Sequence, residues 1–135
     1  MKHLSIAAMA AVATAIQVLW ASPDAPSSAD LSDAPWAYLP WLCLPAMGVA
    51  ATAWFCGRHL PPRWRTLPVS LAMAGYWLLL DVYEFTVRVA AWSTFSTPSL
   101  WLHALRNAAL PVLVCSAAFA WGVLWLAQRT PAPGR

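Results

Sequence analysis

Four long apolar stretches alternate with short polar segments along the 135-residue chain. A transmembrane helix needs about 20 predominantly apolar residues, and each stretch approaches or exceeds that length. The pattern therefore predicts an all-α fold, in which one membrane domain consists of a bundle of four transmembrane helices. The expected helices cover residues 4–20, 36–56, 68–92 and 98–128.

The segments between these stretches have the composition of loops. Residues 21–35 combine Pro, Ser and Asp without Lys or Arg, which is typical of a solvated loop. Residues 57–67 contain three Arg, one His and a Pro-Pro pair. Residues 129–135 form a basic tail rich in Pro, which we expect to be disordered.

Prolines interrupt two of the expected helices. Pro40 and Pro45 fall in the first half of the second stretch, so this helix either begins near Trp41 or bends there. The last stretch contains Pro111 and would extend about 45 Å at about 1.5 Å per residue. Because this exceeds the thickness of the hydrocarbon core, we expect tilting, a bend at Pro111 or an interfacial first turn.

The first stretch, "LSIAAMAAVATAIQVLW", also has features of a secretory signal peptide. A basic start precedes it, and Ala13 to Ala15 has the small-x-small pattern of a cleavage site. The apolar run nevertheless continues past this site to Trp20. We therefore favour a retained helix over a cleaved signal peptide.

The basic residues indicate an orientation, because cytoplasmic loops carry an excess of Lys and Arg. If all four helices span the membrane, Lys2, the Arg residues of segment 57–67, Arg129 and Arg135 fall on one side. This distribution predicts that both termini and residues 57–67 are cytoplasmic. Residues 21–35 would then face the periplasm of a Gram-negative cell, and the expected location is the inner membrane.

Composition supports a lipid environment. Hydrophobic residues make up 61% of the chain and charged residues 10%, with a mean hydropathy of +0.58. A soluble domain carries about 25% charge, so this chain lacks the polar side chains to cover a surface in water. The ten Trp are typical of membrane–water interfaces. The lipid bilayer is thus an expected partner, whereas the thinly spread net charge of +3 does not favour nucleic-acid binding.

No pattern of catalytic or metal-binding residues emerges. Cys43, Cys56 and Cys115 lie in apolar runs without a C-x-x-C pair or zinc-like spacing. The chain has no Gly-rich phosphate loop, H-E-x-x-H or G-x-S-x-G motif. We therefore expect no enzyme activity, no cofactor and no metal.

Three charges interrupt the third stretch within the segment "DVYEFTVR". On a helix, Asp81, Glu84 and Arg88 are spaced i, i+3 and i+7 and share one face. For a helix over 68–92, Asp81 lies near the bilayer midplane and Arg88 near the outer surface. A charge at the centre costs at least about 2.5–3.5 kcal/mol, so these side chains need partners.

The last stretch offers a matching polar set: His103, Arg106 and Asn107. In an antiparallel hairpin Glu84 and Arg106 fall at similar depth, which predicts an ion pair between them. Arg88 would lie opposite the His103 region, and Asp81 nearest Asn107 or the helix turn beyond it. Asp81 has the weakest match in this scheme, and a protonatable carboxyl at such depth is typical of a proton relay or cation site.

This polar layer admits three interpretations: it fixes helix packing, it contacts a membrane-protein partner, or it forms an ion path. The first two favour a non-enzymatic accessory or interaction component of a larger membrane system. The third favours a small oligomeric channel or proton-coupled transporter, including a holin-like permeabilising protein, that uses Asp81 and Glu84. The expected partners are accordingly the bilayer and either another membrane protein or further copies of the chain.

Overall fold

The computed structural model describes residues 2–21, 35–61, 64–88 and 96–128. Its long helices are α1 (Lys2–Ala21), α2 (Pro35–Cys56), α3 (Thr66–Arg88) and α4 (Thr97–Gln128), and a 3-10 turn, η1 (Gly57–His59), follows α2. The described ranges contain no strand. Each long helix has a segment long and apolar enough to cross a membrane. The prediction of an all-helical chain with four such helices is confirmed, while its orientation stays a prediction.

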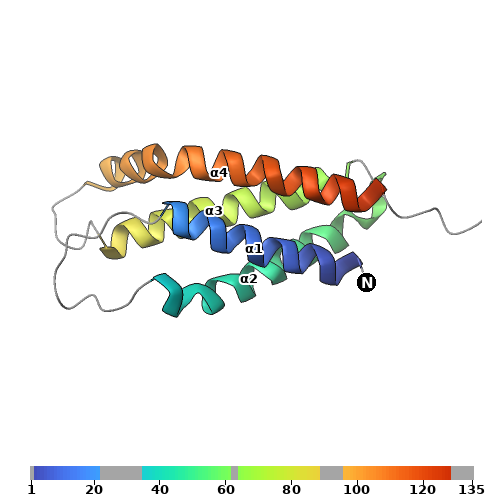
Figure 1. Ribbon diagram of the computed structural model, residues 1–135. Helices are drawn as coiled ribbons and strands as arrows, with labels where there is room; N and C mark the ends of the chain where they lie inside the picture. The colour runs from blue at the N-terminus through green and yellow to red at the C-terminus, as the bar shows by residue number, and fades with distance from the viewer. Residues whose placement is uncertain (1, 22–34, 62–63, 89–95, 129–135) are drawn as a thin grey trace, which may run out of the picture.

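The helices lie side by side and run alternately up and down (Figure 1). α1 packs against α2 and α4, and α3 packs against the same two helices, so that α1 and α3 lie diagonally across the bundle. We call the end that carries the start of α1, η1 and the end of α4 the terminal end. The opposite end, where α1 and α3 finish, is called the far end.

Every long helix contributes apolar side chains to one shared core. Ile6, Ala50, Met73 and Val123, one from each helix, are buried in it. The outer faces are equally apolar: Leu4, Trp41, Leu79, Leu113 and Trp121 are all exposed. A bundle that is apolar on both its inner and outer faces suits lipid rather than water.

α2 runs through both of its prolines instead of beginning near Trp41. Pro35 stands at its first position, where a missing N–H costs no helical hydrogen bond. Pro45 cannot donate to the carbonyl four residues earlier, so the ladder is interrupted in this turn. In the same turn the Tyr76 hydroxyl of α3 donates to the Leu42 carbonyl at 2.7 Å. This cross-helix bond ties the interrupted part of α2 to α3.

α3 begins at Thr66, two residues before the predicted start, so Pro68 falls in its first turn. Residues 89–92, which the prediction included in this helix, lie outside the described residues. α4 is continuous from Thr97 through Pro111 to Gln128. Its bounds differ by one residue at the start from the predicted 98–128.

Arginines close the connection between α2 and α3 at the terminal end. Arg65 donates to the Leu60 carbonyl at 2.8 Å and also to the Arg58 carbonyl. The guanidinium of Arg58 lies 4.5 Å from the centre of the Phe55 ring. Arg65 lies 5.9 Å from that of Trp54. Aromatic rings and guanidinium groups thus gather at this end, as expected for a membrane–water boundary.

Candidate functional site

Asp81, the charge predicted to be deepest, finds its partner on α1. It lies on α3, half-buried, and Gln17 of α1 donates from Nε2 to its Oδ1 at 2.9 Å and to its Oδ2 at 2.7 Å. Gln17 is fully buried. A charge-assisted pair of hydrogen bonds therefore joins the two diagonal helices.

A second hydrogen bond lies about one helical turn closer to the terminal end. Trp77 of α3 donates from Nε1 to Oγ1 of Thr14 on α1 at 3.0 Å, and both side chains are fully buried. α1 and α3 run in the same direction. Thr14 precedes Gln17 by about one turn of α1, and Trp77 precedes Asp81 by about one turn of α3. The two contacts therefore lie at successive levels of the bundle. We call these four residues the polar ladder.

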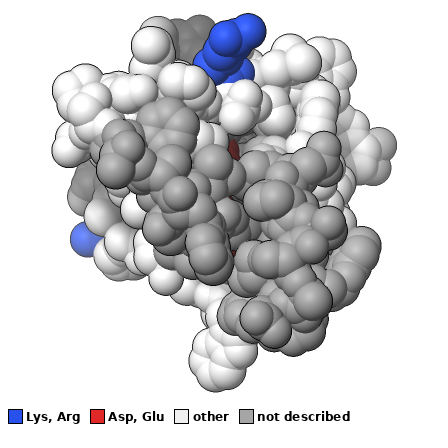
Figure 2. Space-filling model, turned by 90° about the vertical axis from the view of Figure 1, so that its left-hand side faces the viewer, with Lys and Arg blue, Asp and Glu red and all other residues white. Residues whose placement is uncertain are grey.

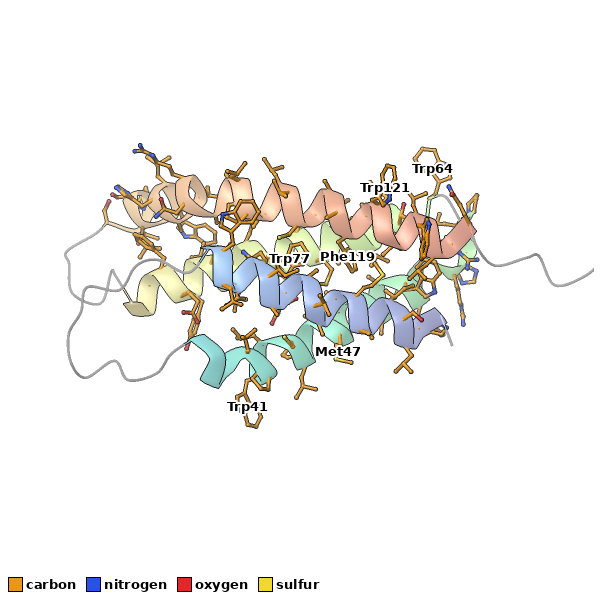
Figure 3. All side chains as sticks on the ribbon, in the orientation of Figure 1. Trp41, Met47, Trp64, Trp77, Phe119 and Trp121 are labelled. Atoms are coloured by element: carbon orange, nitrogen blue, oxygen red, sulfur yellow. The ribbon has the colours of Figure 1, made fainter. Side chains whose placement is uncertain are left out.

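Trp77 also connects the polar ladder to α4. Its ring meets Phe119 edge-on, with ring centres 6.2 Å apart and an interplanar angle of 79°. Both rings point into the middle of the bundle (Figure 3). This geometry is favourable for aromatic pairs, so Trp77 is at once a hydrogen-bond donor and a packing element.

Asn107 of α4 lies in the same region. The sequence predicted that Asn107 would be close to Asp81. The two residues line a cavity of about 10 Å³ together with Phe85 and with alanines from the end of α1 and from α4. A space of this size is about that of one water-sized probe. Asp81 is therefore close to a small cavity as well as to Gln17.

The remaining charges do not assemble as expected. Arg106 and His103 are exposed on α4, and Glu84 is half-buried on α3. Among the contacts of the described residues no ion pair joins Glu84 to Arg106. The reason is helical phase: the buried positions around it are Ala104 and Ala108, so Arg106 lies on the outer side of α4. Equal depth along two helices does not bring two side chains together.

His103 makes local contacts instead. Its Nδ1 lies 2.8 Å from the Ser99 carbonyl one turn earlier in α4. Its ring stacks on Phe85 of α3, with ring centres 6.3 Å apart and an interplanar angle of 23°. The side chain of Arg88, which was predicted to face this region, lies outside the described residues.

Gln17 and Thr14 were missed by the sequence analysis. The signal was present, because Gln17 is the one amide within the first apolar stretch and Thr14 lies three residues before it on the same face. The charges of the last stretch are the stronger signal in the sequence, because charges dominate the cost of inserting a helix into a membrane. An amide in a membrane helix is itself a strong indicator of an interhelical hydrogen bond.

The core on the terminal side of the polar ladder is apolar. Ile6, Val69, Met73 and Val123 fill it and are essentially inaccessible. Among the described residues, Ser70 and Ser116 have buried hydroxyls without a partner, but neither belongs to a continuous polar track. No group of three His, Cys, Asp or Glu in the described part of the chain could hold a metal. The functional groups at the site are therefore the carboxyl of Asp81 and the amides of Gln17 and Asn107.

An apolar groove lies on the outside of the bundle along the seam between α1 and α4. It has a volume of about 430 Å³, and we call it the α1/α4 groove. Near it Gly122 permits close approach, because a methyl group at this position would overlap the end of Met9. The residues that shape the groove include Ala8, Val12 and Ala13 of α1 and Val114, Cys115 and Ala118 of α4.

In comparisons with known proteins, no family model, no curated protein and no solved structure matches this chain. Its function must therefore be inferred from these residues and their geometry.

Proposed function

We propose that the protein is a non-enzymatic accessory or interaction component of a larger membrane assembly in the cell inner membrane. The observation that most strongly supports this proposal is the packed apolar core. Met73, Val69 and Ile6 fill the bundle on the terminal side of Asp81. A conducting bundle would need polar or solvated groups along its whole length. The polar ladder instead ends at Trp77 and joins helices.

The α1/α4 groove is the surface that best suits a partner. Its floor and walls are apolar, and Ala8 and Ala118 would let the backbone of another transmembrane helix approach closely. Exposed Arg58 at the terminal end supports a cytoplasmic location for that end. The proposed partner is thus a second membrane protein that crosses the same bilayer and lies along α1 and α4.

The competing proposal is a small oligomeric channel or proton-coupled transporter, including a holin-like one. Its support is Asp81, a carboxyl within a membrane-length helix. Because the core of one bundle is filled, its path would have to run between copies of the chain.

A photo-crosslinking experiment in native membranes tests the interaction proposal. A photoreactive residue would replace Val12 or Ala118 in the groove and, as matched controls, Leu71 or Leu79 on the exposed face of α3. We expect both groove positions to capture the same single membrane protein, and both controls to capture lipid. Lipid adducts at all four positions would contradict the proposal, and adducts with the chain itself would favour the oligomeric alternative.

Flux through reconstituted vesicles separates the two proposals directly. Vesicles that contain the purified chain should conduct protons no faster than empty vesicles. Proton or ion flux that is abolished by Asp81→Asn would overturn the accessory role.

A further inference from the structure

The contact between Gln17 and Asp81 leaves one strong hydrogen-bonding atom unused. Gln17 Nε2 serves both carboxyl oxygens of Asp81, at 2.9 and 2.7 Å. Gln17 Oε1 is buried and has no hydrogen-bond partner. Since Gln17 is fully buried, water does not compensate for the missing bond. A buried acceptor on the same amide group as Nε2 thus lacks a donor.

One proton would complete this site. A protonated carboxyl has one O–H donor and one carbonyl acceptor, which matches the acceptor and donor of a primary amide. The O–H of Asp81 would donate to Gln17 Oε1, while Gln17 Nε2 donates to the other oxygen of Asp81. Because Nε2 contacts both oxygens, the amide must turn within its own plane to bring Oε1 toward one of them. The proton comes from water, and no other bond is made or broken.

The surroundings of Asp81 favour a proton over a basic side chain as the neutralising partner. α1 presents Gln17 and Thr14, which are neutral, and α4 presents Asn107 and the thiol of Cys115. α3 adds the acidic Glu84 one turn away. The exposed His103 and Arg106 of α4 form no ion pair with Asp81 among the described residues, and the side chain of Arg88 lies outside them.

The remaining titratable groups near the core are farther along the bundle. From α2, Cys43 donates to the Ala11 carbonyl at 3.4 Å, and Tyr76 of α3 donates to Leu42. These groups are occupied with backbone carbonyls. Neither one supplies a positive charge that could take the place of a proton at Asp81.

Asp81 lies toward the far end of the bundle, where α3 finishes. Figure 2 faces this end and shows only small areas of acidic surface, recessed near its centre. Asp81 and Glu84 are the acidic residues of the described ranges, and Asp81 lines the 10 Å³ cavity. Toward the terminal end, Trp77 and Met73 close the core. The terminal side of Asp81 is therefore filled by packed side chains, which suits a binding site and not a path.

A metal cation fits this geometry less well than a proton. Gln17 directs its N–H groups toward the carboxyl, and an N–H group repels a cation. A sodium ion would require several oxygen ligands, whereas the cavity holds about one water-sized body.

We propose that Asp81 and Gln17 form a proton-binding site in the far half of the bundle. The bound proton bridges the Asp81 carboxyl and Gln17 Oε1 and fastens α3 to α1. This site goes beyond the proposed accessory role and does not depend on the identity of a partner. It makes the contact between the diagonal helices responsive to pH.

Infrared difference spectroscopy of the full chain in lipid membranes tests the proposal. As pH is raised, we expect loss of a carbonyl band from a protonated carboxylic acid. This band should be missing in Asp81→Asn and present in the matched control Glu84→Gln. In Gln17→Met, which keeps the size of the side chain but removes the acceptor, the band should shift in frequency. Labelling the wild type with ¹³C-aspartate should also shift it, which assigns it to aspartate without any mutation.

Three results would overturn the proton-binding site. The first is the lack of any aspartate-derived acid band at every pH at which the protein stays folded. The second is an unchanged band frequency in Gln17→Met, because the proton would then not bridge to Gln17. The third is loss of the band on adding sodium at constant pH, which would make the site one for a cation. Circular dichroism of each variant shows whether the helices are retained.

Discussion

The two halves of the bundle are held together in different ways. The terminal half packs apolar side chains such as Ile6, Met73 and Val123 against one another. The far half places Gln17 and Asp81 in the corresponding interior position and joins them by hydrogen bonds. In lipid the hydrophobic effect does not draw apolar helices together, so close packing and hydrogen bonds decide which helices meet.

This difference explains the diagonal contact between α1 and α3. The diagonal pair α1 and α3 has less contact than any adjacent pair of long helices, so side chains long enough to cross the core matter most there. Trp77, Gln17 and Asp81 have that length. The apolar half therefore supplies packing density, and the polar half supplies the specific pairing of α1 with α3.

The largest expected effect comes from removing Trp77, which belongs to both halves. Trp77→Ala should destabilise the bundle by about 3–5 kcal/mol, because it opens a cavity and leaves Thr14 without its donor. Thermal unfolding in detergent measures the loss. Trp121→Ala is the matched control, because Trp121 is 76% exposed, and it should change stability by no more than about 0.5 kcal/mol. Equal effects of the two substitutions would contradict the assignment of Trp77 to the core.

Disrupting the polar half should have an intermediate effect. Gln17→Leu removes both hydrogen bonds that Nε2 donates to Asp81 and should cost about 1–2 kcal/mol, because a half-buried carboxyl loses its partner. The double variant Gln17→Leu, Asp81→Leu should regain most of this stability, because both polar partners are then gone. Denaturant titration of the four proteins of this cycle gives the coupling energy. A coupling energy near zero would show that the two residues do not interact.

A smaller effect is expected where α1 meets α4. Gly122→Ala should cost about 1 kcal/mol, because the added methyl group displaces the flexible end of Met9. Met9→Ala combined with Gly122→Ala should remove the clash. Gly75→Ala is the matched control, because a Cβ at Gly75 meets no atom within 4 Å. Melting temperatures of the three variants check whether α1 and α4 are as close as the structure shows.

The sequence predicted the four membrane-length helices because apolar length alone signals such an element. It did not predict the partner of Asp81. The depth of a residue within the bilayer can be estimated by counting residues from the ends of a helix. This estimate placed Asp81 near Asn107, and the two residues line the same cavity. Direction around a helix depends on which neighbours it packs against, and this decides whether Arg106 faces the core. Gln17 was overlooked because it is neutral, although a buried amide needs a partner as much as a charge does.

The smallest expected effect concerns the pair that sequence reasoning favoured. Arg106 is exposed on α4, so Arg106→Gln should change stability by no more than about 0.5 kcal/mol. A large loss, reversed by Glu84→Gln in the same chain, would show that Glu84 and Arg106 do pair in the membrane. The measurement is thermal unfolding in lipid nanodiscs, with Arg106→Lys as the control that retains the charge. If both variants melt at the temperature of the wild type, Gln17 and Asp81 are the contact that joins α1 to α3 in the far half. The charge of Arg106 then interacts with lipid headgroups and not with Glu84.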